Sequence, residues 1–76
     1  MEILRLRIEK QGRGGKTVTV VAGFTREWAL MEKLASELKR SLGTGGSFQD
    51  RELLLQGDVR GRLRTLLGGM GFRVKG

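Results

Sequence analysis

The chain contains no cysteine, histidine, proline, tyrosine or asparagine. Without cysteine it cannot form disulfides, and without cysteine or histidine it lacks the ligands of the usual structural metal sites. We therefore expect no metal and no other cofactor, and the lack of cysteine fits a cytoplasmic protein. Because there is no proline, the thirteen glycines are expected to make the turns.

The lack of histidine also bears on catalysis, because general acid and base work at neutral pH most often uses that side chain. The carboxylates are scattered along expected helix faces and turns, and no nucleophile has a visible base. We therefore predict that the chain is not an enzyme, has no catalytic residue and has no small-molecule substrate. Apolar stretches such as Leu53–Leu55 are only strand-sized and the start has no signal-peptide core, so no membrane partner is expected.

Positive charge dominates what the sequence does contain. Fifteen Lys and Arg stand against eight Asp and Glu, so the formal net charge is +7 and the pI is about 11.2. This excess favours a polyanionic partner, and nucleic acid is the leading candidate. The 76 residues suffice for one domain, 1–76, which we expect to be monomeric and too small to enclose a deep site. Function is therefore expected on the outer surface.

The chain opens with a pattern typical of a β-hairpin. Residues 3–10 alternate apolar and charged side chains, and residues 16–21 alternate Val18 and Val20 with threonines. The glycine-rich segment 11–15 between these runs predicts a turn with a flexible basic tip.

A helical period begins at Arg26. Its predicted buried stripe consists of leucines spaced by four, widened by a methionine and an alanine: Leu30, Leu34, Leu38, Leu42, Met31 and Ala35. Gly43 is expected to end this helix. A second helix is expected to follow Asp58, its predicted N-cap, and to stop at Gly68-Gly69, with an apolar face made by Val59, Leu63, Leu66 and Leu67.

Three further strands complete the prediction. Ser47–Asp50 and Glu52–Gln56 are predicted to form a short hairpin turning at Asp50-Arg51, and Phe72–Lys75 a final strand. The order is therefore β-β-α-β-β-α-β. Both helices are too narrowly amphipathic to be surrounded by core, so the sequence predicts an α+β two-layer sandwich, with a mostly antiparallel sheet and two helices on one face.

Gly15-Lys16-Thr17 resembles the end of a phosphate-binding P-loop, in which glycine amides and a lysine hold a nucleotide at a helix N-terminus. The first glycine of that pattern would fall at Lys10, and the motif leads into a predicted strand. No helix dipole would therefore point at the phosphates, and nucleotide binding is not expected.

The strongest candidate site is the tip of the first hairpin, where Arg13 and Lys16 are flanked by Arg5, Arg7 and Lys10. Cations on a projecting loop can pair with nucleic-acid phosphates while a glycine-rich backbone adapts. The alternative is a solvated turn that keeps the hairpin soluble. Binding is the favoured interpretation, because the tip adds to a charge excess of the whole chain.

The first predicted helix offers a weaker site. Arg26, Lys33 and Arg40 fall seven residues apart on the face opposite the leucines. That face is equally consistent with an RNA contact and with ordinary solvated surface. For Phe24 and Trp28, which precede the leucines, core packing is favoured over base stacking.

Several segments in register resemble eukaryotic initiation factor 1 and its bacterial YciH-type and archaeal relatives: residues 7–20, 34–40, 43–46, 56–58 and 71–75. The resemblance covers nearly the whole chain and implies the same two-layer fold that the patterns predict. It also implies a factor that sits on the small ribosomal subunit near the peptidyl-tRNA site. Such factors help to reject wrong start codons or wrongly paired initiator tRNA.

In the eukaryotic members of that family the basic hairpin loop and part of the first helix face ribosomal RNA. Carried over to this sequence, the resemblance implies phosphate contacts by Arg13, Lys16, Lys33, Lys39 and Arg40, in a loop that adapts through Gly12, Gly14 and Gly15. The implied partner is the RNA of the small subunit, with other initiation factors as further candidates. Two alternatives stay open: a general RNA-binding module or translational regulator, and a protein-interaction domain without RNA contact.

Overall fold

The predicted order of elements is confirmed by the structure, a computed structural model that describes residues 3–11, 14–25 and 28–76. The elements are β1 (Ile3–Gln11), β2 (Lys16–Ala22), α1 (Trp28–Leu42), β3 (Gly46–Gln49), β4 (Glu52–Gln56), α2 (Arg60–Gly69) and β5 (Arg73–Lys75). Their ends differ from the predicted ones by at most two residues. The first two residues predicted for the long helix, 26–27, lie outside the described residues.

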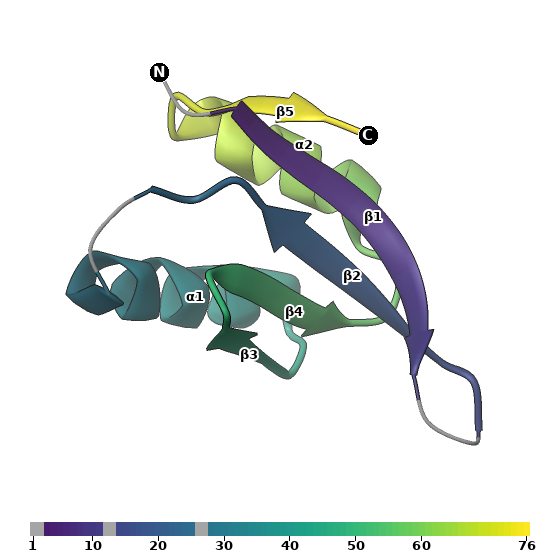
Figure 1. Cartoon of the computed structure of the whole chain (residues 1–76). Helices are drawn as coiled ribbons and strands as arrows, with labels where there is room; N and C mark the ends of the chain where they lie inside the picture. The colour runs from purple at the N-terminus through teal and green to yellow at the C-terminus, as the bar shows by residue number, and fades with distance from the viewer. Residues whose placement is uncertain (1–2, 12–13, 26–27) are drawn as a thin grey trace.

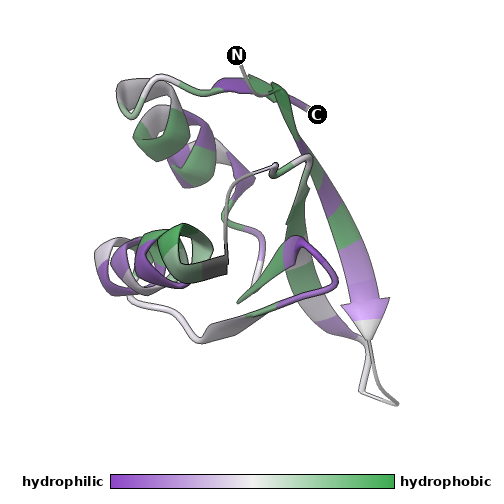
Figure 2. Cartoon of the chain, turned by 60° about the vertical axis from the view of Figure 1, so that its left-hand side comes forward, coloured by the Kyte–Doolittle hydropathy of each residue, from purple (hydrophilic) through white to green (hydrophobic). Residues whose placement is uncertain are grey.

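The strands form one mixed sheet in the order β3-β4-β2-β1-β5. Neighbouring strands are antiparallel except for β1 and β5, which are parallel. Both helices lie on the same side of this sheet (Figures 1 and 2). The predicted α+β two-layer sandwich is therefore confirmed, and we call the side of the sheet without helices the open face.

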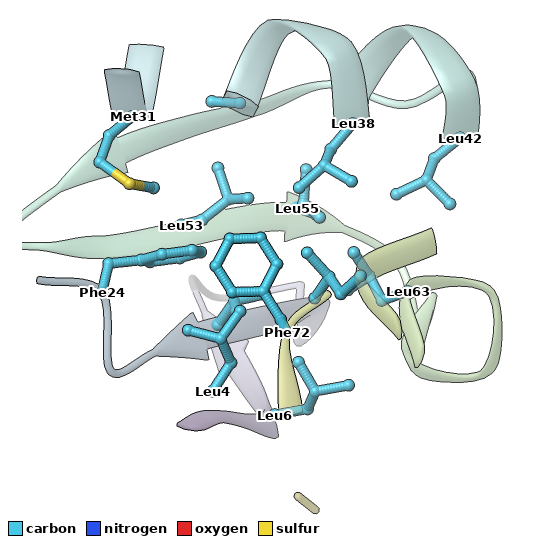
Figure 3. Packing of buried hydrophobic residues seen from close by; sticks show 13 residues of the cluster. Leu4, Leu6, Phe24, Met31, Leu38, Leu42, Leu53, Leu55, Leu63 and Phe72 are labelled. Carbon is cyan, nitrogen blue, oxygen red and sulfur yellow. The ribbon is translucent and has the colours of Figure 1, made fainter. Parts of the chain in front are cut away.

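The core lies between the sheet and the two helices (Figure 3). Phe24, which follows β2, stands edge-on to Phe72 and to Phe48, with ring centroids 6.3 and 6.1 Å apart. Phe24 and Phe72 are 4% and 8% exposed, so the predicted core role of Phe24 is confirmed and neither ring is available for base stacking.

The buried face of α1 is rotated from the predicted one. It consists of Met31, Ala35, Leu38 and Leu42. Leu34 is only partly buried, and Leu30 is 52% exposed, so the predicted stripe is wrong at Leu30. Leucines spaced by four drift about 40° around the helix at each step, because one turn takes 3.6 residues. Steps of four, three and four keep side chains on one face, and the observed core residues follow that spacing.

β2 turns its threonines, and not its first two valines, toward the helices. Thr19 and Val21 are fully buried, and Val21 belongs to the core cluster. Val18 and Val20 lie on the open face, where they are still only 9% and 1% exposed. The alternation is typical of a half-buried strand, but residues 18–21 are buried on both sides of β2. Thr19 can lie on the core side because its hydroxyl donates to the Gly57 carbonyl at 2.6 Å and accepts from the Val59 amide at 3.0 Å.

Both predicted ends of the second helix need correction. Val59 is the N-cap residue of α2, and Asp58 precedes it and accepts from the Arg60 amide at 3.3 Å. At the other end the helix continues through the predicted stop. Gly71 follows the helix with a φ of 94°. Its amide donates to the Gly68 carbonyl, and the Phe72 amide donates to the Leu67 carbonyl. This Schellman arrangement turns the chain back into the core.

Asp50 and Arg51 form the two-residue turn between β3 and β4, and both have positive φ, 52° and 61°. Such a type I′ turn normally takes Asn or Asp followed by Gly. We expect Arg51→Gly to stabilise the protein by about 0.5–1 kcal/mol, measured by urea denaturation, because glycine relieves the left-handed strain. Asp50→Gly should gain less, because aspartate tolerates this conformation better. No gain from Arg51→Gly would mean that the arginine side chain compensates for its backbone.

Arg62 on α2 joins the two helices. Its guanidinium donates to the carbonyls of Ser41 and Leu42 at 3.0 and 3.2 Å, at the end of α1 where carbonyls lack helical partners. Arg62→Ala is expected to cost about 1 kcal/mol of unfolding free energy, and so about 4–8 °C in Tm. Arg64→Ala, on the same helix, is the control and should be nearly neutral. Equal Tm values for the two variants would refute the capping role.

Candidate nucleic-acid interface

The β1–β2 hairpin extends beyond the helix layer (Figure 1), and Lys16, one of the cations predicted to bind RNA, lies at the start of β2. Lys16 is the first residue of β2 and its side chain is exposed. Gly14 and Gly15 are exposed too, and Gly15 has a φ of 62°, a conformation that favours glycine. Arg13 and Gly12 lie outside the described residues, so their roles stay predictions.

Lys16 also borders an open groove of about 790 Å³ beside β3 and β4. Its lining also includes the apolar Val18 and Leu54 and the polar Ser47, Gln49 and Gln56. Among the described residues, none that lines the groove is acidic. The groove therefore offers a cation, amides and a hydroxyl to an anionic or polar ligand, with apolar side chains among them.

Of the four cations predicted on the first helix, Arg26 lies outside the described residues, and the other three have different surroundings. Lys33 and Arg40 are exposed, and at seven residues apart they lie on nearly the same side of α1. Lys39 is half-buried, and its ammonium donates to the Gly46 carbonyl at 3.4 Å. Gly46 also lines the groove that Lys16 borders. The structure therefore ties Lys39 to the first residue of β3 and leaves Lys33 and Arg40 on the outer helix surface.

Arg7 is neutralised by neighbouring carboxylates. It donates to both carboxylate oxygens of Glu52, at 2.9 and 3.2 Å, and to Glu9 at 3.2 Å. The hydrogen bonds from Arg7 hold the pKa of Glu52 below its usual value, so this carboxylate stays ionised and paired down to lower pH. Arg7, which the sequence placed among the cations flanking the hairpin tip, is therefore not free to bind phosphate without breaking these pairs.

Arg60 is paired in the same way. Its side chain donates twice to Asp58 at 3.0 Å, and this bonding holds the pKa of Asp58 below its usual value. Within the described part of the chain, by contrast, no carboxylate pairs with Lys16, Lys33 or Arg40. Unpaired positive charge that an anionic partner could meet therefore remains at the hairpin end and on the exposed side of α1.

The family model of translation initiation factor SUI1 matches residues 1–73. The chain belongs to the SUI1 family. It is 41% identical to the protein translation factor SUI1 homolog of Hyperthermus butylicus over 71 aligned residues. The aligned residues cover 93% of this chain and 68% of that relative. The homolog from Sulfolobus acidocaldarius is also 41% identical over 71 residues, covering 93% and 71%. A protein of Escherichia coli named YciH is 38% identical over 73 residues, covering 96% and 68%.

Membership of the SUI1 family assigns the chain a role in translation initiation, and this is a family of initiation factors and not of enzymes. The resemblance to initiation factor 1 and YciH stated from the sequence is thereby confirmed. In the part of the chain that the structure describes, no helix is long and apolar enough to cross a membrane. The matched region includes the β1–β2 hairpin and α1.

Proposed function

We propose that this chain binds the small ribosomal subunit near the peptidyl-tRNA site and contributes to the selection of the start codon and initiator tRNA. The proposal rests on the initiation role of the SUI1 family and on one structural observation. The exposed Lys16 of the projecting hairpin has no ion-pair partner among the described residues, whereas Arg7 on the adjacent strand is paired twice. Charge left unpaired on a projecting element is available to a polyanion.

The proposed contacts are hydrogen-bonded ion pairs with the phosphates of ribosomal RNA. Lys16 and Arg13 would make them at the hairpin end, with Gly12, Gly14 and Gly15 letting the loop fit the RNA. Contacts of this kind give affinity and position more than base recognition. Fidelity would then follow from where the factor sits, beside the codon and the tRNA.

The exposed side of α1 supplies the second half of the proposed interface. Lys33 and Arg40 are free to reach phosphates, and Lys39 would have to exchange its bond with the Gly46 carbonyl for one with RNA. Lys39 is therefore expected to contribute less affinity than the other two. The factor would act as a monomer in the cytoplasm.

Co-sedimentation with separated small and large ribosomal subunits, at low and moderate salt and with a bulk-RNA competitor, tests the proposal. Selective, saturable binding to the small subunit is the expected result. Equal binding to both subunits and to the competitor would instead indicate a general RNA-binding module. No binding to any RNA would indicate a protein partner, and either of these results would overturn the proposed function.

A further inference from the structure

The open face of the sheet carries a second group of cations, at the edge formed by β1 and β5. Arg5 on β1 and Lys75 on β5 are directly opposite each other in the parallel register, and Arg73 pairs with Ile3 two residues away on the same face. Arg5, Arg73 and Lys75 are all exposed, and we call them the basic edge. Neighbouring strands lie about 4.8 Å apart, and alternate residues along one strand are about 6.6 Å apart. The Cα atoms of the three residues are therefore close together.

No carboxylate among the described residues pairs with the basic edge. On the same face of β1, the next cation, Arg7, is held by Glu9 and Glu52. The open face is thus divided into a neutralised centre and a positively charged edge. The sequence shows the alternation that exposes Arg73 and Lys75, but it does not show that their strand lies beside Arg5.

Folding stability does not explain the basic edge, because like charges directly opposite on neighbouring strands are destabilising. Protection of an edge strand from aggregation explains cations on β5, which ends the sheet. It does not explain Arg5, because β1 is an interior strand between β2 and β5. A cluster that costs stability and extends inward from the edge points to a ligand of negative charge.

We propose that the basic edge is a second RNA-binding surface, separate from the hairpin and α1, which holds phosphates of the same RNA partner. RNA is favoured over an acidic protein because protein interfaces need an apolar or aromatic centre. Among the described residues the exposed large apolar side chains are Ile3, Leu30 and Met70, and of these only Ile3, at 41%, pairs with a residue of the basic edge in the sheet, while Phe72 is buried. Phosphate contacts require only the cations themselves.

The test compares the double variant Arg5→Gln/Arg73→Gln with the control Arg51→Gln/Arg64→Gln. The control also removes two arginine charges, but away from the basic edge. Affinity is measured for small subunits and for bulk RNA over a series of salt concentrations. The edge variant is expected to lose about tenfold or more in affinity, and its log–log salt slope should fall by about 1.4, for two lost phosphate contacts. The control should stay within about twofold of wild type.

Loss of structure is separated from loss of contact by two further measurements. The Tm of the edge variant should equal or exceed that of wild type, because a repulsive pair has been relieved. Arg5→Lys/Arg73→Lys, which keeps the charge, should retain most of the affinity. Unchanged binding of the Gln variant, or equal losses in the edge and control variants, would overturn the proposal.

The inference uses the proposed function only for the choice of subunits as the RNA probe, so the two can fail separately. If wild type selects the small subunit and the edge variant binds it equally well, the basic edge is not an RNA surface and the proposed function stands. If wild type shows no selectivity and the edge variant still loses affinity for bulk RNA, the proposed function fails and the basic edge survives.

Discussion

Reversing the charge of Arg13 and Lys16 together is expected to reduce affinity for the small ribosomal subunit by a factor on the order of a hundred. Each side chain is proposed to make a charged hydrogen bond with a phosphate, worth about 1.5 kcal/mol, and tenfold in affinity corresponds to about 1.4 kcal/mol. The log–log salt slope should also fall by about 1.4, because two phosphate contacts are lost. Co-sedimentation of Arg13→Glu/Lys16→Glu measures both quantities.

Net charge alone would also lower affinity, so the control must carry the same change. Arg51→Glu/Arg64→Glu serves this purpose: each reversal removes two units of charge, and both double variants fall from +7 to +3. The control should lose only a fewfold in affinity, through weaker long-range attraction. If the hairpin variant binds like wild type, or no worse than this control, the assignment of Arg13 and Lys16 is wrong.

Thr19→Val is expected to be the most destabilising of the substitutions considered, lowering the unfolding free energy by about 3 kcal/mol. Valine has nearly the same shape, but it leaves the Gly57 carbonyl and the Val59 amide without the hydroxyl that now bonds both. Each such loss costs about 1–3 kcal/mol. The Gly57 amide already bonds the Thr17 carbonyl at 2.8 Å, so the connection to α2 is held to β2 at several points.

Urea denaturation and thermal melting followed by circular dichroism measure this loss, which should lower Tm by more than about 10 °C. Thr17→Val is the matched control, because Thr17 lies two residues earlier on the same strand and is only half-buried. It should be neutral or slightly stabilising, since valine favours strands. Similar losses for the two variants would show that β-strand packing, and not the Thr19 hydroxyl, holds the start of α2.

The pattern of polar and apolar residues was enough to predict the order of the elements and the two-layer fold. Period-two runs at residues 3–10 and 16–21 and the helical period after Arg26 are local signals, and each needs only its own side chains to be read. Gly43 likewise ends α1 as predicted, with a φ of 65°. Turn and cap residues act within a few positions of the chain, so their effect is visible without the fold.

The predictions that were wrong concern residues whose position depends on contacts between different elements. In β2 both faces are buried, and the face with Thr19 meets the helices because the Thr19 hydroxyl is bonded by the loop before α2. In α1 the leucine repeat allowed Leu30 into the stripe, and the position of the sheet excluded it. Asp58 was predicted as the N-cap, but Val59 occupies that position, and its amide donates to the Thr19 hydroxyl.

In the candidate site, too, local features could be predicted from the sequence, and contacts between distant residues could not. Lys16 could be singled out from the sequence, because an exposed cation beside glycines in a hairpin turn needs no tertiary contact to be accessible. Pairing between distant residues could not be predicted: Glu52 reaches Arg7 across 45 residues of sequence and removes that arginine from the free cations. The parallel pairing of β5 with β1 likewise places Lys75 opposite Arg5. Charge is a property of each residue, but whether it is neutralised or concentrated depends on which strands the fold brings together.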